Sequence, residues 1–328
     1  MSTEAKGELQ AQMKELGYKT NEVQTQLGHY LVAIGKQSFD IRQIGSLAGV
    51  KDVHRVSDAF KLVSRKWKVQ PTRIDLGEGG QIGEGQFTVM AGPCSIESEE
   101  QIIRILDHLK AEGVQIMRGG VYKPRSSPYS FRGLGIDGLK LWAKLAREKG
   151  IKIITEVMQV SQIDAMHEYV DIFQIGARNT QNFNLLDALG KVDKPVLLKR
   201  GISGTIEELL QSAEYIFSGG NEKIMLCERG IRSYEGAYRN CMDINAIALL
   251  KTKSHLPVIA DPSHGIGIRS HVEPVALAAV MAGADGVIFE MHPQPEEAFS
   301  DAQQSLSFRE STKLIKRMRA AFALKEEF

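Results

Sequence analysis

Short apolar runs that alternate with helical patterns dominate the chain from Gln86 to about Leu324. Eight of these runs are short, apolar and bounded by turn residues, and they predict buried strands. The runs are Phe87–Ala91, Val114–Met117, Ile151–Thr155, Ile172–Ile175, Val196–Leu198, Ile224–Leu226, Val258–Ala260 and Val287–Phe289. Because the segments between them have helical periodicity, the pattern predicts crossover helices and a parallel sheet.

The number and spacing of the runs favour an α/β fold, the closed (β/α)8 or TIM barrel. The region is about 240 residues long, close to the roughly 250 typical of this fold. A doubly wound open sheet is the competing topology. It is disfavoured because no Gly-x-Gly-x-x-Gly string comes directly after a predicted strand.

Residues 1–56 predict a small α+β unit before the barrel. Its predicted elements are a helix over Gly7–Gly17, strands at Glu22–Leu27 and Tyr30–Ile34, a short helix after Asp40 and a strand at Val53–Val56. This order is that of a ferredoxin-like (ACT-like) sandwich that lacks its first strand. We expect a linker over residues 57–72 and a barrel over residues 73–328. The barrel is expected to open with a hairpin of Ile74–Leu76 and Gln81–Ile82.

Nearly every predicted barrel strand is followed by a charged or metal-binding side chain. In strand order, these are Cys94, Arg118 with Lys123 and Arg125, Glu156, Arg178, Lys199 with Arg200, Glu228 with Arg229, Asp261 with His264, and Glu290. The carboxyl ends of all strands in such a barrel converge on one mouth, where these enzymes keep their active sites. We therefore expect one face of the protein to collect its chemistry.

The composition is that of an ordinary soluble protein, with a formal net charge of +1 and an isoelectric point near 7.7. No overall field therefore favours nucleic acid or an anionic membrane. Three cysteines are too few, and odd in number, for a disulfide framework. The first 25 residues lack an apolar signal-peptide core, and no apolar stretch is long enough to span a membrane. We expect a cytoplasmic protein whose basic mouth suits a small, multiply anionic substrate.

Four residues after strands one, seven and eight form the strongest candidate cluster. They are Cys94, His264, Glu290 and Asp301. Because these strands become neighbours when the barrel closes, a thiolate, an imidazole and two carboxylates can meet and hold a divalent ion. Taken singly, each residue has a structural alternative, such as a core thiol or a solvated carboxylate. His292, two residues beyond Glu290, is a rival ligand because that spacing places both on one face of a strand.

A second candidate cluster lies in the segment 118–127, which carries Arg118, Lys123, Arg125 and Ser126. Its glycines let the backbone approach a ligand, and arginine forks match carboxylate and phosphate groups. A basic surface loop is the alternative interpretation. The position of the segment directly after a barrel strand favours a binding role.

Further cations follow other strands, namely Arg178, Lys199, Arg200 and Arg229. Some of them could instead form structural salt bridges with Glu156 or Glu228. Glu156 itself could orient a base or touch substrate. Cys227 and Cys241 are interpreted as packed thiols.

Taken together, the motifs of this chain resemble 3-deoxy-D-arabino-heptulosonate 7-phosphate (DAHP) synthase of the type Iβ branch. The matching strings are Ala-Gly-Pro-Cys-Ser at 91–95, Arg-Gly-Gly-Val-Tyr-Lys-Pro-Arg-Ser-Ser-Pro-Tyr-Ser-Phe at 118–131, Gln-Ile-Gly-Ala-Arg-Asn at 174–179, Leu-Leu-Lys-Arg-Gly at 197–201, Leu-Cys-Glu-Arg-Gly-Ile-Arg at 226–232, Asp-Pro-Ser-His at 261–264 and Ser-Asp-Ala-Gln-Gln-Ser at 300–305. They cover the whole predicted barrel in order, about three quarters of the chain.

The resemblance implies a metal-dependent, aldol-type condensation of phosphoenolpyruvate with erythrose 4-phosphate, the first step of the shikimate pathway. It implies that Cys94, His264, Glu290 and Asp301 hold the divalent cation, and Mn, Fe, Co and Zn all suit such ligands. From the chemistry of the reaction, Lys123 is our candidate general acid toward the aldehyde oxygen. The resemblance assigns the phosphoenolpyruvate carboxylate and bridging region to Arg118, Lys123 and Lys199, its phosphate to Arg178, Lys199 and Arg229, and the sugar phosphate to Arg125 and Ser126. A homotetramer is also implied.

Relatives of this branch often carry a complete ferredoxin-like module that binds tyrosine or phenylalanine. Here the first strand is missing, because the module is shortened or the natural start lies upstream, so the effector is a weaker implication. One rival is 3-deoxy-D-manno-octulosonate 8-phosphate synthase, which uses arabinose 5-phosphate. The Lys-Pro-Arg-Ser string at 123–126 argues against it. The other rival is a noncatalytic amino-acid sensor built from a degraded enzyme. Such a protein would have lost a metal ligand or a phosphate-binding arginine, yet every expected one is present in this sequence.

Overall fold

The computed structural model describes residues 3–35, 38, 40–123 and 129–327, so the predicted contacts Arg125 and Ser126 lie outside the described residues. Eight parallel strands close into a barrel in which β12 pairs with β5. The strands are β5 (Thr88–Gly92), β6 (Ile116–Arg118), β7 (Lys152–Glu156), β8 (Ile172–Ile175), β9 (Val196–Lys199), β10 (Ile224–Glu228), β11 (Val258–Ala260) and β12 (Gly286–Glu290). Each strand overlaps one predicted run, so the barrel is confirmed and the open sheet is wrong.

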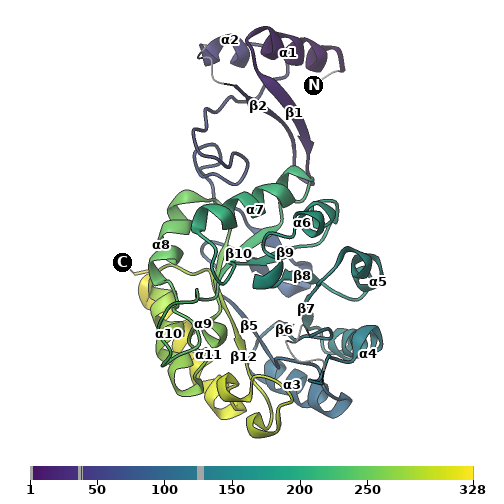
Figure 1. Cartoon of the computed structure of the whole chain (residues 1–328), viewed down its shortest axis with the longest axis vertical. Coiled ribbons are helices and arrows are strands. Elements are labelled where there is room, and N and C mark those ends of the chain that lie inside the picture. Colours follow the sequence, from purple (N-terminus) through teal and green to yellow (C-terminus); the bar gives the residue numbers. More distant parts are fainter. Residues whose placement is uncertain (1–2, 36–37, 39, 124–128, 328) are drawn as a thin grey trace.

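Helices surround the barrel (Figure 1). They are α3 (Glu99–Ala111), α4 (Gly135–Glu148), α5 (Ile163–His167), α6 (Phe183–Leu189), α7 (Ile206–Ser218), α8 (Ile244–Lys253), α9 (Pro262–Ile266), α10 (Arg269–Met281) and α11 (Phe308–Lys325). Their apolar faces are buried against the strands, as Leu106, Trp142 and Ile216 show. None of the described helices is both long enough and apolar enough to cross a membrane.

A short hairpin closes the amino-terminal end of the barrel, as predicted. Its strands are β3 (Ile74–Asp75) and β4 (Gln81–Ile82). Ile74 and Ile82 are buried against the side chains that fill the barrel interior. Gln115, which lies just before β6, donates from Nε2 to the backbone oxygen of Glu78 at 3.3 Å. Because the hairpin covers this end of the barrel, only the carboxyl-terminal mouth is open for an active site.

The amino-terminal module contains α1 (Thr3–Glu15), β1 (Lys19–Gln24), β2 (His29–Ile34) and α2 (Ile41–Gly45). The antiparallel pair β1–β2 packs against α1 through a small core that includes Leu9, Met13 and Ile44. The strand predicted at Val53–Val56 is wrong. The Val53 side chain packs on that core, but its backbone N–H is taken by the Asp52 carboxylate at 2.8 Å. The described module therefore has two strands, where three were expected.

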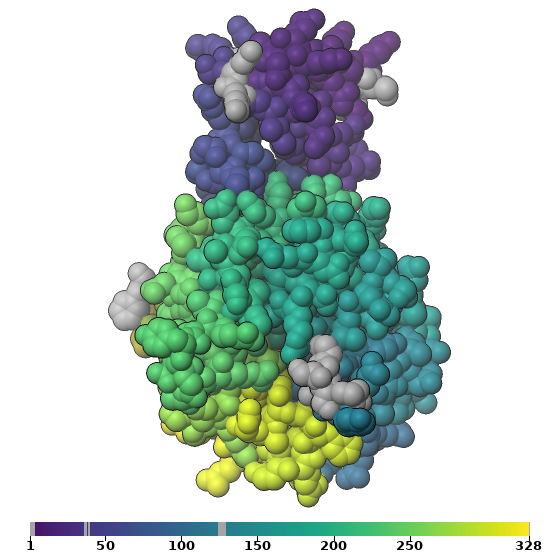
Figure 2. Space-filling model, viewed as in Figure 1, coloured from purple at the N-terminus to yellow at the C-terminus, as the bar shows by residue number. Residues whose placement is uncertain are grey.

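The module forms a separate lobe that meets the barrel at its hairpin turn (Figure 2). Gln26 donates from Nε2 to Asn221 Oδ1 at 3.3 Å and accepts from the backbone N–H of Glu222 at 3.1 Å. Thr25 donates its hydroxyl to the Glu222 carboxylate, which is 1% exposed. The Tyr30 ring lies 5.2 Å from that of Trp67. These contacts join the module to the loop between α7 and β10, at the amino-terminal end of the barrel strands.

The segment 57–72, predicted to be a linker, packs on the barrel. Phe60, Leu62 and Val63 are buried in the main core. The backbone N–H groups of Leu62 and Val63 both donate to the Glu214 carboxylate of α7, at 2.9 and 3.0 Å. This segment is therefore part of the folded barrel unit.

Candidate active site

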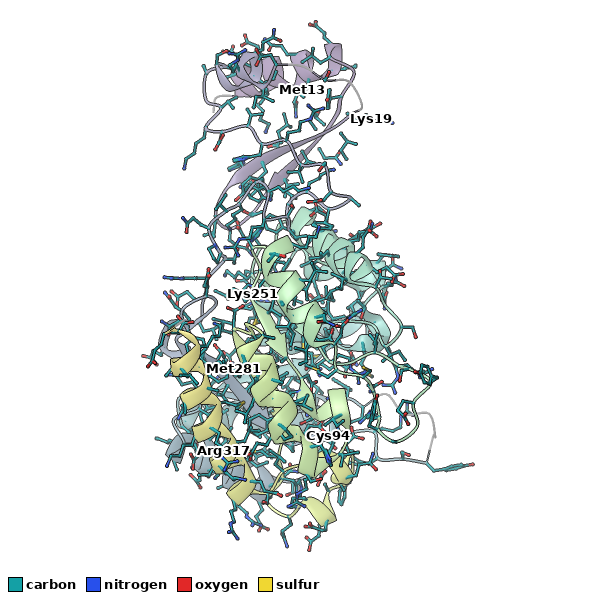
Figure 3. All side chains as sticks on the ribbon, turned by 90° about the vertical axis from the view of Figure 1, so that its left-hand side faces the viewer. Met13, Lys19, Cys94, Lys251, Met281 and Arg317 are labelled. Carbon is teal, nitrogen blue, oxygen red and sulfur yellow. The ribbon has the colours of Figure 1, made fainter. Side chains whose placement is uncertain are left out.

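The local chain path after β5 and β6 sets the centre of the site. Cys94 follows β5 in the barrel lobe, far from Met13 and Lys19 of the module (Figure 3). Gly92 ends β5, and a Cβ atom there would lie 2.0 Å from the backbone oxygen of Arg118. Glycine therefore allows β5 and β6 to approach closely where the polar side chains begin. Glu290 pairs in register with Gly92.

The four predicted metal ligands come together in the structure. Donor atoms of Cys94, Glu290 and Asp301 all lie within 4.8 Å of one another. Cys94 Sγ is 3.4 Å from Asp301 Oδ2. His264 Nε2 lies 3.6 Å from Glu290 Oε1 and 3.9 Å from Asp301 Oδ2. Residues from three strand ends and one later loop therefore converge as the closed barrel requires.

Asp261 fixes the direction of His264. Its carboxylate caps α9 by accepting from the His264 backbone N–H at 3.1 Å, and Oδ2 lies 2.8 Å from His264 Nδ1. This close contact is an ion-pair distance only, because among the described residues the buried Nδ1 atom has no hydrogen-bond partner of suitable geometry. Burial lowers the pKa of His264, which favours the neutral imidazole that a metal ligand needs.

Burial and neighbouring charges set the protonation of the cluster. Burial, followed by the charge of Glu290, raises the pKa of the Cys94 thiol to about 11. Burial would also raise the pKa of Asp301, but Arg239, His264 and Lys123 outweigh it and lower that pKa to about 2. The site therefore holds a thiol that must lose its proton to bind a cation, beside a carboxylate that is already ionised.

His292, the rival ligand, lies in a different hydrogen-bond network. Its Nδ1 atom is 2.7 Å from the backbone oxygen of Gln294, and its Nε2 atom is 3.3 Å from Glu97 Oε2. His264 Nε2, in contrast, lies 3.6 Å from Glu290 Oε1 and 3.9 Å from Asp301 Oδ2. The structure therefore favours His264 over His292.

Two predicted substrate-binding cations lie within the cluster. Arg118 is 5% exposed and donates from one guanidinium nitrogen to Glu290 Oε1 at 2.7 Å and to the backbone oxygen of Pro93 at 3.0 Å. Lys123 donates from Nζ to Cys94 Sγ at 3.1 Å. Each cation therefore contacts one of the proposed metal ligands directly.

The remaining predicted cations divide into buried and exposed groups. Lys199 is buried and donates to Asp261, while Arg229 is buried with burial lowering its pKa. Arg178 is exposed. Arg200 forms the structural salt bridge considered from the sequence, 2.9 Å from Glu228 Oε2.

Glu156, whose role the sequence left open, lies against Gly176 of the next strand end. A Cβ atom at position 176 would be 2.0 Å from its carboxylate. Glycine therefore leaves room for this carboxylate beside β8. This contact places the Glu156 carboxylate beside β8. It does not decide whether Glu156 orients a base or touches the substrate.

Two residues of the site were missed by the sequence analysis, Arg239 and Gln304. Arg239 lies in the connection between β10 and α8, and Gln304 ends a 3-10 turn over Ala302–Gln304. Arg239 contacts Asp301 Oδ2 at 3.3 Å and donates to Gln304 Oε1 at 2.7 Å. Gln304 donates from Nε2 to Glu290 Oε2 at 2.6 Å. Neither follows a strand directly, so strand-end reasoning could not find them.

A closed parallel barrel that collects a thiol, an imidazole, carboxylates and cations at its carboxyl-end mouth defines a (β/α)8-barrel enzyme. A sequence profile described as the DAHP synthetase I family matches residues 69–325. The chain belongs to this family, and the resemblance to DAHP synthases is confirmed.

Several relatives agree with this membership. The phospho-2-dehydro-3-deoxyheptonate aldolase of Thermotoga maritima is 50% identical over 274 residues, which cover 84% of this chain and 81% of the relative. The 2-dehydro-3-deoxyphosphooctonate aldolase of Syntrophobacter fumaroxidans is 32% identical over 259 residues, which cover 73% of this chain and 88% of the relative. The first similarity is much stronger than the second.

Solved structures extend the similarity to the module. The crystal structure of Thermotoga maritima phospho-2-dehydro-3-deoxyheptonate aldolase (DAHP synthase) matches with a TM-score of 0.81 and 44% identity, covering 99% of this chain and 96% of that chain. A truncated form of the 3-deoxy-D-arabino-heptulosonate 7-phosphate synthase of the same organism has a TM-score of 0.76 and 46% identity. It covers 81% of this chain and 98% of that chain.

Proposed function

We propose that this enzyme condenses phosphoenolpyruvate with erythrose 4-phosphate and water to give 3-deoxy-D-arabino-heptulosonate 7-phosphate and phosphate. The observation that carries the proposal is the convergence of Cys94, His264, Glu290 and Asp301 beside Arg118 and Lys123. This arrangement suits anionic substrates that react next to a divalent cation. The 50% identity with a phospho-2-dehydro-3-deoxyheptonate aldolase supports the same reaction.

The four donors fit a divalent cation. Atoms bound to one ion at about 2.0 to 2.3 Å lie within about 4 to 4.6 Å of one another. The separations of 3.4 Å for Cys94–Asp301, and of 3.6 and 3.9 Å from His264 to the two carboxylates, satisfy this limit. The mixed thiolate, imidazole and carboxylate set suits Mn, Fe, Co or Zn.

The side chains around this cluster have separate tasks in the proposed reaction. Arg118, Lys199 and Arg229, all buried or nearly so, hold the carboxylate and phosphate of phosphoenolpyruvate, and Arg178 adds to the phosphate site. Arg125 and Ser126, outside the described residues, are assigned to the sugar phosphate. A bound divalent cation supplies Lewis-acid polarisation of the aldehyde.

Lys123 is assigned the general-acid role. As C3 of phosphoenolpyruvate attacks the aldehyde carbon, the Lys123 ammonium gives a proton to the aldehyde oxygen. Water adds at C2, and phosphate leaves with cleavage of its C–O bond. Lys123 Nζ lies 3.1 Å from Cys94 Sγ, so the acid stands beside the metal ligands.

The experiment follows phosphoenolpyruvate consumption with erythrose 4-phosphate, and with arabinose 5-phosphate in parallel. We expect turnover with the four-carbon sugar that EDTA stops and Mn(II) restores. Turnover with the five-carbon sugar alone would assign the octulosonate reaction, to which the relative at 32% identity corresponds. Absence of turnover with either sugar and added metal would overturn the catalytic proposal in favour of a sensor.

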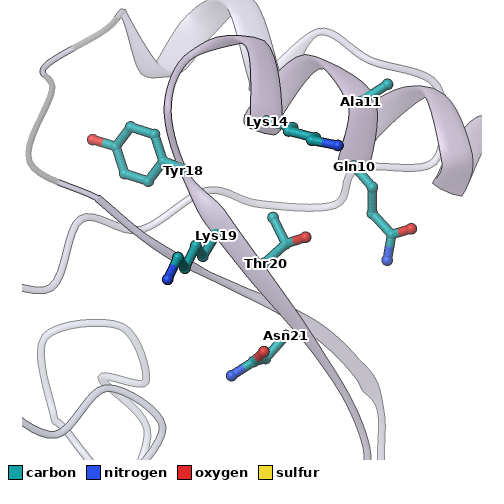
Figure 4. Close-up of a pocket in the computed structure, with 7 residues that line it drawn as sticks. All are labelled: Gln10, Ala11, Lys14, Tyr18, Lys19, Thr20 and Asn21. Carbon is teal, nitrogen blue, oxygen red and sulfur yellow. The ribbon is translucent and has the colours of Figure 1, made fainter.

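Feedback inhibition by tyrosine or phenylalanine belongs to the same proposal and is tested by adding each amino acid to this assay. The module has an open hollow of about 500 Å³ between α1 and β1 (Figure 4). It is lined by Gln10, Ala11, Lys14, Tyr18, Lys19, Thr20 and Asn21. The presence of this hollow does not distinguish a module that binds an aromatic amino acid from one that does not. The homotetramer and the cytoplasmic location stay predictions.

A further inference from the structure

Two side chains from separate loops link the carboxylates of the metal cluster. Arg239 contacts Asp301 Oδ2 at 3.3 Å and donates to Gln304 Oε1 at 2.7 Å. Gln304 in turn donates from Nε2 to Glu290 Oε2 at 2.6 Å. The chain of contacts thus runs from one carboxylate to the other. In the interactions found among the described residues, neither Arg239 nor Gln304 contacts His264 or Cys94 directly.

The backbone around Arg239 holds it in place. Its N–H donates to the backbone oxygen of Ile266 at 3.0 Å, at the end of the helix that carries His264. Gly267 follows with a φ of 72°, and a Cβ atom there would lie 2.3 Å from Arg239 Cβ. A glycine is needed both for this left-handed backbone and for the close approach. Arg239 is therefore seated against α9 before any ligand binds.

Gln304 is held equally firmly and in one orientation. Its side chain is buried, and its backbone N–H donates to the Asp301 oxygen at 3.2 Å. Its amide oxygen faces a guanidinium, and its amide nitrogen faces a carboxylate. A flipped amide would set oxygen against carboxylate and NH2 against guanidinium, so only one orientation satisfies both neighbours.

Asp301 needs such support. Among the described residues it is the one non-glycine residue with a positive φ, at 51°. Aspartate tolerates this conformation better than most residues, yet it persists only where the surroundings impose it. Arg239 holds the side chain of this residue, and Gln304 holds its backbone oxygen.

We propose that Arg239 and Gln304 are positioning residues that hold Asp301 and Glu290 in the arrangement that binds the divalent cation. The inference rests on the proposed metal-dependent function. Residues that orient metal ligands from behind commonly change metal affinity by about 10- to 100-fold when removed. The competing role for Arg239, direct binding of a substrate anion, predicts a raised KM with unchanged metal affinity.

The experiment titrates metal-free full-length protein with Co(II) and records the absorption bands of Co(II) bound to thiolate. Arg239→Met, Arg239→Lys, Gln304→Met and the double variant Arg239→Met/Gln304→Met are compared with the parent protein. We expect about 10- to 100-fold weaker Co(II) binding and altered bands in both methionine variants, with partial rescue by lysine. The double variant is expected to match the weaker single variant, because both residues act through one chain of contacts.

Arg269→Met is the matched control. Arg269, two residues beyond Gly267, is likewise a partly exposed arginine in ion pairs, with Glu296 at 2.7 Å and Glu310 at 2.7 Å, and neither carboxylate belongs to the proposed metal cluster. Thermal melting separates an unfolded variant from a folded one with a disturbed site. The two Arg239 variants are more certain to fold than the Gln304 variants, because the Arg239 side chain is 33% exposed and Gln304 is buried.

Three results would overturn the inference. Parental Co(II) affinity and bands in folded Arg239→Met and Gln304→Met variants would show that the pair positions nothing. A raised KM with parental Co(II) affinity would assign Arg239 to the substrate. If the parent protein bound no Co(II), the proposed metal site itself would fail, and that result is read before any variant is compared.

Discussion

Lys123 Nζ lies 3.1 Å from Cys94 Sγ and 3.0 Å from the backbone oxygen of the same residue. The two residues come from the loops after adjacent strands β5 and β6. Burial raises the pKa of the Cys94 thiol to about 11, and the charge of Lys123 works against that rise. The proposed proton donor and a proposed metal ligand therefore lie side by side at the barrel mouth, and this contact is the basis of the first prediction.

Lys123→Met is expected to lower kcat by about 10²- to 10⁴-fold, the usual contribution of a general acid. Co(II) binding is expected to persist, because the four donor side chains are unchanged. Steady-state rates and Co(II) titration measure the two effects. Lys140→Met, at an exposed position on α4, serves as control. An unchanged kcat would remove Lys123 from the proton transfer.

Gly92→Ala is expected to destabilise the protein by about 1 to 3 kcal/mol, the usual cost of overpacking. A Cβ atom at Gly92 would lie 2.0 Å from the Arg118 backbone oxygen, so β5 and β6 would have to separate. Activity should fall as well, since Cys94 follows two residues later. Urea unfolding and turnover test this. Gly236→Ala, which meets no atom within 4 Å, should behave like the parent protein; equal stability of the two variants would refute the close approach.

Stability is expected to fall between pH 7 and pH 5 because of His255. Burial lowers its pKa to about 4, and its ring nitrogens contact Thr72 Oγ1 and the Leu62 oxygen, each at 2.7 Å. An unfolded histidine has a pKa of about 6.5, so below that pH only the unfolded chain gains the proton. The contribution is complete above pH 6.5 and is lost as the pH falls toward 4.

The expected loss from pH 7 to pH 5 is about 2 kcal/mol from this residue. Urea unfolding at both pH values measures it in the parent protein and in His255→Gln, where the loss should shrink by that amount. His29→Gln, at an exposed position on β2, should keep the parental difference. The same pH response in His255→Gln and the parent would exclude His255 as the cause.

Thr25→Val is expected to weaken the contact between module and barrel. It removes the hydroxyl donor to the buried Glu222 carboxylate, at a cost of about 1 to 3 kcal/mol. The Glu222 backbone N–H, which donates to Gln26 at 3.1 Å, should then exchange with deuterium about 5- to 100-fold faster. Thr20→Val, on β1 before the turn that carries Thr25, is the control. Unchanged exchange would mean that the rest of the junction holds the lobes together.

The barrel was predictable because its signal is local. Runs such as Val196–Leu198 and Val258–Ala260 are apolar on both faces, and helical segments separate them, so strand type and order can be read along the chain. Closure then follows from having eight such units. The strand expected at Val53–Val56 failed because strand formation needs a partner edge, and β-branched residues alone do not supply one.

The convergence of the proposed metal donors was predictable for a related reason. Cys94, His264 and Glu290 each follow a strand closely, and closed topology forces these ends together. Arg239 and Gln304 could not be found in this way. Their places depend on how two loops fold back over Asp301, and loop paths are decided by contacts with residues far away in the chain.

The sequence by itself determined the eight strands, their parallel order and the set of donors and cations at their ends, because apolar periodicity and strand-end position are properties of short segments. Only the tertiary structure decided which donors face one another, that His292 pairs with Glu97 and not with the cluster, and that Arg239 and Gln304 support the carboxylates. These outcomes depend on distances between atoms whose residues lie up to two hundred positions apart, and packing of the whole chain fixes such distances.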